Sequence, residues 1–302
     1  MKKLRLVVLL GGPGSERQVS IASGKNIVSA LSSKENSSRY VVRTIDARDP
    51  KRVLEQLKAA KPDVIFPIVH GTFGEDGTLQ AILEIFGKPY VGSRVLASAL
   101  AMDKVTSTKL LKSQGLSTPP LLDDRIAKFP CVVKPRASGS SVGVSIVRSR
   151  KDLNAALRLA KREGEPMIQE FIQGLELTCG VLEFERGNPF ALPVTEIIPK
   201  SKFFDYKAKY TKGGSDEITP ARIPSALAKK VQLAALLAHK TLGCRHISRS
   251  DFIISKSKKV YYLETNTAPG MTATSLIPQA ARAAGISLPE LAHTLVQATL
   301  LK

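Results

Sequence analysis

Two stretches near the C-terminus decide the fold: Ser248–Ile254, SRSDFII, and Val260–Thr272, VYYLETNTAPGMT. Both are rich in β-branched, aromatic and other apolar residues, as strands are. The SKSKK segment between them is short enough to be a turn. We therefore predict two adjacent strands joined by this turn.

Polar side chains share one face of these strands, because residues two apart on a strand point the same way. The set has one guanidinium, two carboxylates and one amide, from Arg249, Asp251, Glu264 and Asn266. Hard oxygen ligands suit magnesium, and the set contains no soft ligand that zinc would prefer. The pattern predicts a magnesium site for a triphosphate, although solvent-facing strand residues could give the same short match.

The composition is that of an ordinary globular protein. The 302 residues, 43% hydrophobic and 24% charged, could form two or three domains of ~100–150 residues. No run approaches the ~20 apolar residues that span a bilayer, and we interpret Leu4–Leu10 as a buried strand, not a signal peptide. The cysteines lie far apart in apolar runs, as reduced thiols of a cytoplasmic protein do: Cys131, Cys179 and Cys244.

The net charge of +19 is high, with 45 Lys and Arg against 26 Asp and Glu. A basic nucleic-acid-binding protein is therefore an alternative of a different class. The basic residues are spread over the whole length and there is no tryptophan, so solvated helix faces explain the charge better. A basic cleft also suits an anionic substrate such as ATP.

The first part of the chain, 1–96, alternates strand and helix patterns. Strands are predicted at 4–10, 40–47, 63–71 and 89–93, with helices after residue 15, at 53–60 and from about 77. This order predicts an open parallel sheet, whose ligands gather at the carboxyl ends of the strands.

The remainder divides at about residue 168. Residues 97–168 carry two helix patterns and a glycine-rich hairpin, 129–147. Residues 169–302 carry strands at 177–184 and 190–198, a basic loop at 200–218, a long helix at 224–242, the two polar strands, and a last helix with Leu288, Leu291, Leu295 and Leu300. We expect three domains at these boundaries, with the loop 200–218 as a mobile lid.

Three glycine-rich segments could contact ligands. The hairpin lacks a Walker sequence but could close over phosphates, with Lys134 on its first strand, or could be a surface hairpin. Glu16 follows the turn GGPGS and could complement a helix dipole or receive a ligand ammonium. Glu75 and Asp76 in HGTFGEDGT could cap the next helix.

Eight segments, in order, resemble the D-alanine–D-alanine ligases of the ATP-grasp superfamily. They are LLGGPGSERQVSIASG from 9, HGTFGEDGTLQ from 70, MDK from 102, VVKPRASGSSVGVS from 132, FFDYKAKY from 203, TPA from 219, SRSDF from 248 and LETNTAPGMTATSLIP from 263. Collinear matches over nearly the whole chain are far more specific than any single motif.

The resemblance implies a three-domain α/β enzyme. Its N-terminal domain would be a parallel, Rossmann-like α/β domain, followed by a small central α+β domain and a C-terminal α+β domain, with ATP between the last two. The substrates would be ATP and D-alanine, the cofactors two magnesium or manganese ions, and the product a dipeptide for peptidoglycan. A cytoplasmic homodimer that binds neither nucleic acid nor membrane is expected.

The resemblance also implies roles for individual residues. ATP contacts are expected from Lys104, Lys134, Gly139, Ser141, Gln169, Glu170, Ile172, Glu176 and Lys209. The metal ligands would be Asp251, Glu264 and Asn266, with Glu264 between the ions. Substrate binding and catalysis are expected from Glu16, His70, Ser140, Tyr210, Arg249, Gly270, Ser275 and Leu276. Among these, Arg249 and the Gly270 N–H would form an oxyanion site.

Two positions depart from the family pattern. Gln169 stands where a glutamate usually faces the adenine amino group, and either it or Glu170 could make that contact. Ala81 replaces a glycine that is common in the family at this position, and we expect a helix to tolerate the alanine. A D-alanine:D-lactate ligase, or another ATP-grasp carboxylate–amine ligase, remains the alternative. In the family that the chain resembles, members that form a dipeptide have a tyrosine in this AKY segment, and Lys209 and Tyr210 follow that pattern.

Overall fold

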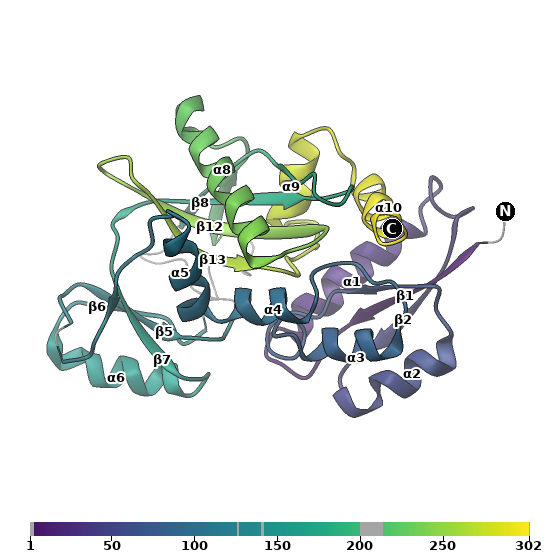
Figure 1. The fold of residues 1–302 in the computed structure, drawn as a ribbon, viewed down its shortest axis with the longest axis horizontal. Coiled ribbons are helices and arrows are strands. Elements are labelled where there is room, and N and C mark those ends of the chain that lie inside the picture. Colours follow the sequence, from purple (N-terminus) through teal and green to yellow (C-terminus); the bar gives the residue numbers. More distant parts are fainter. Residues whose placement is uncertain (1–2, 126, 140–141, 200–213, 302) are drawn as a thin grey trace.

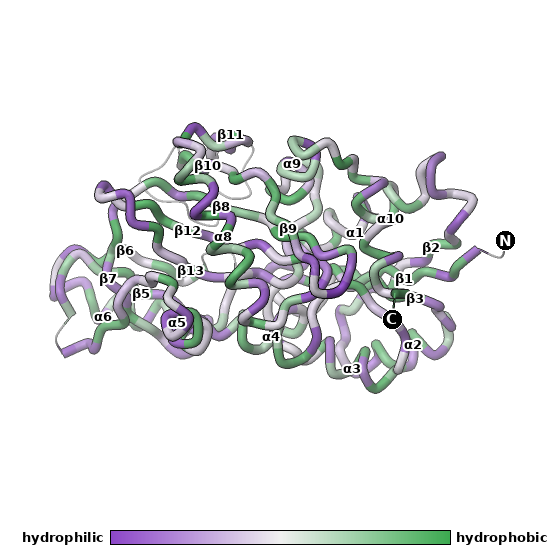
Figure 2. The backbone as a smooth tube through the Cα atoms, turned by 45° about the horizontal axis from the view of Figure 1, so that its top comes forward, coloured by the Kyte–Doolittle hydropathy of each residue, from purple (hydrophilic) through white to green (hydrophobic). Residues whose placement is uncertain are grey.

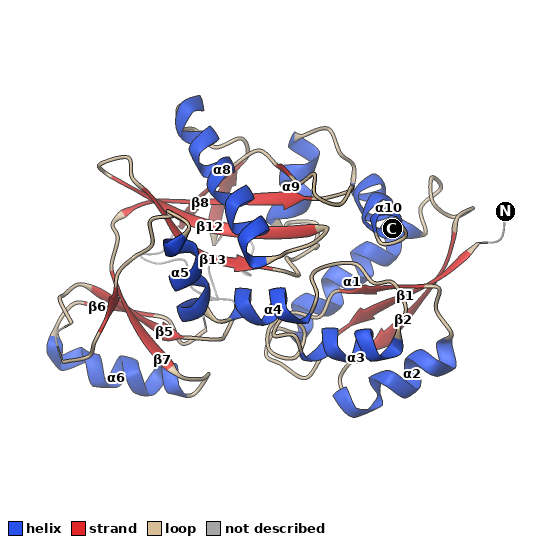
Figure 3. Ribbon diagram, viewed as in Figure 1, coloured by secondary structure: helices blue, strands red, loops and turns tan. Residues whose placement is uncertain are grey.

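The described residues, 3–125, 127–139, 142–199 and 214–301, form three β-sheets in this computed structural model. Figure 1 shows how the sheets are arranged along the molecule, and Figure 3 shows the helices that cover them. The N-terminal sheet is parallel, with order β2-β1-β3, from β1 (Leu4–Leu10), β2 (Tyr40–Asp46) and β3 (Val64–Pro67).

Helices cover both faces of this sheet: α1 (Arg17–Leu31), the 3-10 helix η1 (Pro50–Arg52), α2 (Val53–Ala60), α3 (Thr78–Phe86) and the C-terminal α10 (Leu288–Ala298). Leu6 and Val8 of β1 pack in one core with α1 and α10, and Val7 and Leu9 pack in the other with α2 and α3. Burial on both faces explains the unbroken apolar run 6–10 within β1. The predicted strand at 89–93 is wrong, since only one bridge pairs Tyr90 with Ile65.

The central sheet is antiparallel, with order β4-β7-β5-β6. Its strands are β4 (Leu121–Leu122), β5 (Cys131–Pro135), β6 (Ser145–Val147) and β7 (Pro166–Glu170), and α6 (Arg150–Lys161) packs on it. The predicted hairpin is present as β5 and β6. The expected domain boundary at residue 168 falls inside β7, so a boundary after Glu170 suits the sheets better.

The C-terminal sheet is the largest of the three, and its strands have the order β11-β10-β8-β12-β13, with β9 also paired to β8. They are β8 (Gly174–Leu182), β9 (Phe190–Ala191), β10 (Thr195–Pro199), β11 (Ser215–Ile218), β12 (Ile247–Ser255) and β13 (Val260–Asn266). The predicted strand 190–198 is therefore two strands. The last residues of the expected lid form β11, which pairs with β10, and residues 200–213 lie outside the described residues.

Helices pack around the C-terminal sheet: α4 (Val95–Met102), α5 (Lys104–Ser113), α8 (Ser225–Leu242) and α9 (Leu276–Ala283). Leu177, Phe252 and Tyr262 face α8 in an apolar core. Figure 2 shows the change from hydrophobic to hydrophilic residues along these strands. The predicted last helix ends at Ala298, so Leu300 lies beyond it and is exposed. Within the described residues, no helix combines the length and apolar character that crossing a bilayer requires.

Candidate active site

A cavity of about 640 Å³ lies where the three sheets meet. This volume is within the range of small-molecule sites, ~300–1,000 Å³. Its walls come from the loops after β1 and β3, from β5 and β7, and from the face of β8, β12 and β13 that points away from α8. One ligand could therefore contact all three parts of the chain.

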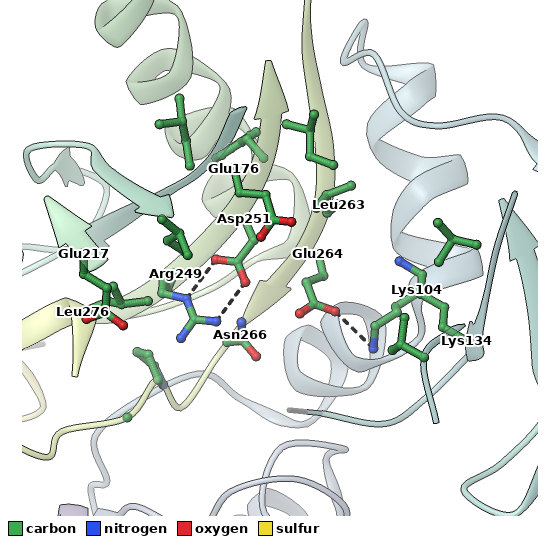
Figure 4. Close-up of a pocket in the computed structure, with 18 of the residues that line it drawn as sticks. Lys104, Lys134, Glu176, Glu217, Arg249, Asp251, Leu263, Glu264, Asn266 and Leu276 are labelled. Carbon is green, nitrogen blue, oxygen red and sulfur yellow. Dashed lines mark hydrogen bonds and ion pairs between the residues drawn. The ribbon is translucent and has the colours of Figure 1, made fainter. Parts of the chain in front are cut away.

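The two polar strands pair as the sequence predicts. β12 and β13 are antiparallel, with Arg249 opposite Asn266 and Asp251 opposite Glu264, so all four side chains share the cavity face. Figure 4 shows them together. Arg249 donates two hydrogen bonds to Asp251, from Nε at 2.9 Å and from Nη2 at 2.8 Å. Thr178 Oγ1 donates a third to Asp251 at 2.6 Å.

The donor set of this face fits magnesium. Two carboxylates and an amide offer hard oxygen atoms, and the amide nitrogen of Asn266 is buried with no hydrogen-bond partner among the described residues. Flipping the side-chain amide of Asn266 would place its oxygen where its nitrogen now lies. In the described part of the chain, no three His, Cys, Asp or Glu side chains are grouped so that they could hold a metal ion. A three-ligand site here would therefore need the Asn266 amide beside the carboxylates of Asp251 and Glu264.

Two lysines face the carboxylates from the other side of the cavity (Figure 4). Lys104 is buried at the start of α5, whose N-cap is Asp103, and its Nζ lies 3.3 Å from Glu264 Oε2. The same Nζ donates to the carbonyl of Ser138 at 2.5 Å. Lys134 on β5 is also buried and lines the cavity. The lysines thus place positive charge beside the strand carboxylates.

The expected ATP contacts near the adenine end lie together at β7 and β8. Gln169, Glu170, Ile172 and Glu176 all line the cavity. Gln169 is buried, with its Nε2 3.5 Å from the Pro119 carbonyl, whereas Glu170 is exposed. Which of the two contacts adenine stays open.

Glu16 is buried and joins two glycine-rich segments. A Cβ added to Gly71 would lie 2.4 Å from Glu16 Oε2, and one added to Gly139 would lie 2.6 Å from it. Gly71 also has φ +72°, where a side chain would be strained. Glu16 is the N-cap residue of α1 but is buried, so the alternative in which it is a surface residue that complements the helix dipole is wrong.

The loop after β3 contacts the turn after β13. His70 Nδ1 donates to the Ala268 carbonyl at 2.9 Å, and burial lowers the pKa of His70 to about 4. Glu75 accepts from the backbone N–H groups of Gly71, at 2.8 Å, and Ala268, at 3.2 Å. Burial raises the pKa of Glu75, and the nearby Glu264 raises it further. Both side chains therefore help to hold the turn that carries Gly270.

The sequence interpretation missed this role of Glu75. We expected that Glu75 or Asp76 could cap the next helix; the N-cap of α3 is Gly77, and of the two carboxylates it is Asp76 that accepts from the N–H of Thr78. Only its place in the glycine-dense HGTFGEDGT segment indicated a ligand-facing loop. On the other side of the turn, Ser275 Oγ accepts from the N–H of Thr272 at 2.9 Å. Gly270, Ser275 and Leu276 all line the cavity.

Comparison with known proteins places this geometry in a family. The family model described as D-ala D-ala ligase N-terminus matches residues 36–93, and the one described as D-ala D-ala ligase C-terminus matches residues 121–297. The chain belongs to the D-alanine–D-alanine ligase family. It is 45% identical to the D-alanine–D-alanine ligase of Syntrophobacter fumaroxidans, over 99% of this chain and 98% of that protein.

Other members of the family agree over the same length. The D-alanine–D-alanine ligase of Pelotomaculum thermopropionicum is 42% identical, over 97% of this chain and 96% of that protein. A Bacillus anthracis D-alanine–D-alanine ligase complexed with ATP superposes with a TM-score of 0.84 at 33% identity, covering 99% and 98% of the two chains. An Enterococcus faecalis D-Ala:D-Ser ligase gives 0.85 at 29% identity, covering 99% and 100%. The three-sheet fold is thus that of the ATP-grasp ligases.

Four residues expected to act in this member of the family lie outside the described residues. They are Ser140, Ser141, Lys209 and Tyr210, together with most of the expected lid. The other expected site residues line the cavity, except Gly139. Gly139 lies against the carboxylate of Glu16, which does line it. Their individual roles stay predictions.

Proposed function

We propose that this chain ligates two D-alanine molecules to D-alanyl-D-alanine in an ATP-dependent reaction, for peptidoglycan precursors. The observation that carries the proposal is the single face of β12 and β13, where Arg249, Asp251, Glu264 and Asn266 meet the buried Lys104. A triphosphate suits the lysines, and the oxygen donors suit magnesium.

The first step activates a carboxylate. A carboxylate oxygen of the first D-alanine attacks the γ-phosphorus of ATP, and the bond to the departing ADP oxygen breaks, giving D-alanyl phosphate. Glu16 would receive the ammonium of this D-alanine, and Lys104 and Lys134 would contact the phosphates. Asp251, Glu264 and Asn266 would hold two magnesium or manganese ions, which supply positive charge to the phosphate oxygens.

The second step forms the amide. The free amine of the second D-alanine attacks the carbonyl carbon of D-alanyl phosphate, and the nitrogen gives up a proton. The tetrahedral intermediate carries negative charge on oxygen, which Arg249 and the Gly270 N–H would stabilise. The bond to phosphate then breaks. Ser275 and Leu276 would bind the carboxylate of the second D-alanine.

Phosphate release and product identity test the proposal directly. With ATP and magnesium, D-alanine should give phosphate and dipeptide in equal amounts, and L-alanine should give neither. D-lactate and D-serine, each supplied together with D-alanine, test the other second substrates found in this superfamily. Predominant D-alanyl-D-lactate at neutral pH would show that the chain forms an ester.

A nucleic-acid-binding protein is the alternative of a different class. It would be favoured by retention on heparin that disappears at modest salt, together with no D-alanine-dependent ATP hydrolysis. We expect instead a cytoplasmic enzyme that acts as a homodimer, as its resemblance to the family implies. Light scattering of the purified protein would measure the oligomeric state.

A further inference from the structure

The turn after β13 is held at two points by side chains from the N-terminal part of the chain. Ala268 and Met271 each have their N–H and their carbonyl group bound, and Gly270 lies between them. The four contacts are Ala268 N–H to Glu75 Oε1 at 3.2 Å, His70 Nδ1 to Ala268 O at 2.9 Å, Met271 N–H to Ser23 Oγ at 3.1 Å, and Asn26 Nδ2 to Met271 O at 2.6 Å.

His70 and Ser23 link the Ala268 carbonyl to the Met271 N–H through three hydrogen bonds that can run in only one direction. The Ala268 carbonyl can only accept, so His70 Nδ1 donates and His70 Nε2 must accept. Ser23 Oγ lies 3.1 Å from that Nε2 and donates to it, while accepting from the N–H of Met271. Burial lowers the pKa of His70 to about 4, so the ring is neutral at pH 7, as this direction requires.

We propose that Ser23 and Asn26 are positioning residues of the oxyanion site, which fix the turn carrying the Gly270 N–H against α1. The inference rests on the proposed ligase function. Ser23 and Asn26 are three residues apart and thus neighbours on one side of α1. Ser23 is fully buried, so water cannot replace its hydroxyl, whereas Asn26 is half-buried.

A loosened turn should slow the second step more than the first. D-alanyl phosphate then persists, and water can attack its carbonyl carbon, giving D-alanine and phosphate in place of dipeptide. The signature is phosphate released in excess of dipeptide. A role in folding alone would lower both products together and leave their ratio at one.

The first test is Ser23→Ala, with phosphate and dipeptide measured in the same reaction. We expect dipeptide formation to fall about tenfold or more, with a phosphate-to-dipeptide ratio clearly above one. Ser20→Ala is the matched control. Ser20 is equally buried on α1, accepts from the N–H of Gly11 at 2.8 Å and donates to the Ile68 carbonyl at 2.6 Å, away from the turn. Its ratio should stay near one.

The second test is Asn26→Asp beside Asn26→Ala. Aspartate has the shape of asparagine but places an ionised oxygen against the Met271 carbonyl, so it should raise the ratio more than alanine does. This half-buried site decides the question if Ser23→Ala does not fold. A phosphate-to-dipeptide ratio of one in Ser23→Ala overturns this inference but not the proposed function. If Ser23→Ala does not fold, a ratio of one in Asn26→Asp has the same consequence. An unmutated protein without D-alanine-dependent phosphate release overturns the proposed function as well.

Discussion

Two pairs of oppositely charged side chains in the cavity differ in how the chain builds them. Arg249 and Asp251 stand two residues apart on β12 and form two parallel hydrogen bonds. Lys104 and Glu264 come from α5 and β13, far apart in the sequence, and meet through one contact of 3.3 Å. The first pair is a property of one strand, whereas the second exists only once helix and sheet have packed.

The second pair therefore connects separate parts of the molecule. Lys104 Nζ also donates to the carbonyl of Ser138, in the glycine-rich hairpin. One buried ammonium thus links α5, the hairpin and β13. Removing one partner of a buried pair leaves the other charge without compensation, which costs more than the pair itself contributes. We expect changes at Lys104 to affect ATP binding, changes at Glu264 to affect turnover through the metal site, and changes at Arg249 to affect the chemical step.

Glu264→Gln should have the largest effect. It keeps the shape of the side chain but removes the negative charge expected to lie between the metal ions. Turnover should fall about 10³-fold or more, because a metal site contributes several kcal/mol and each 1.36 kcal/mol is a factor of ten. The measurement is D-alanine-dependent phosphate release over a magnesium titration. Glu185→Gln, at an exposed residue, is the control. Retained magnesium-dependent turnover in Glu264→Gln would remove this residue from the metal site.

Arg249→Lys tests the first pair at constant charge. Lysine cannot reproduce the fork of two parallel N–H groups that Arg249 presents. We expect kcat to fall about 10²–10³-fold, the loss typical of one oxyanion donor, with little change in the KM for ATP. Arg5→Lys is the matched control, since Arg5 makes the same paired contacts with Asp63 on the surface. A rise in the KM for ATP at unchanged kcat would place Arg249 in ATP binding instead.

The sequence was sufficient to predict the first pair and its strand neighbours. Alternation on β12 and β13 depends only on the two-residue period of a strand, so the common face of Arg249, Asp251, Glu264 and Asn266 follows from their spacing. The parallel direction of β1, β2 and β3 was predictable for a similar reason, because strands and helices alternate along this part of the chain.

Contacts that depend on tertiary packing could not be predicted in this way. Nothing local indicates that Lys104 reaches Glu264, or that Glu75 accepts from the N–H of Ala268. The predicted strand at 89–93 failed because only Tyr90 reaches the edge of the N-terminal sheet, where it pairs with Ile65. Strand propensity alone does not show whether a neighbouring edge is available.

Lys104→Met tests the second pair and should have an intermediate effect. Methionine keeps much of the apolar stem but leaves Glu264 without this ammonium and the Ser138 carbonyl without this donor. ATP should bind about tenfold more weakly or worse, because a hydrogen bond to a charged group contributes ~1.5–3 kcal/mol. Titration calorimetry with ATP measures this. Lys109→Met, at an exposed position on the same helix, should bind ATP normally. Equal affinities in the two variants would contradict a phosphate contact by Lys104.

A third pair, outside the cavity, should show the smallest effect on activity. Glu183 lies 3.6 Å from His239 Nε2 and accepts from the N–H of Gly187 at 2.7 Å. Although burial opposes it, the contact with His239 and the hydrogen bond from Gly187 lower the pKa of Glu183 from 4.5 to about 2. Because the folded-state pKa is the lower one, the stabilisation is present above about pH 4.5 and is lost as the pH falls toward 2.

Glu183→Gln should therefore change stability without changing catalysis. At pH 7 we expect a melting temperature lower by about 3–10 °C, with kcat and the phosphate-to-dipeptide ratio unchanged. The difference in melting temperature between the variant and the unmutated protein should shrink as the pH is lowered from 4.5 toward 2, because Glu183 then becomes protonated in the unmutated protein as well. Thermal melts over this range measure it. A difference that does not depend on pH would mean that packing, not charge, makes this residue stabilising. A loss of kcat comparable to that of Arg249→Lys would end the distinction between pairs inside and outside the cavity.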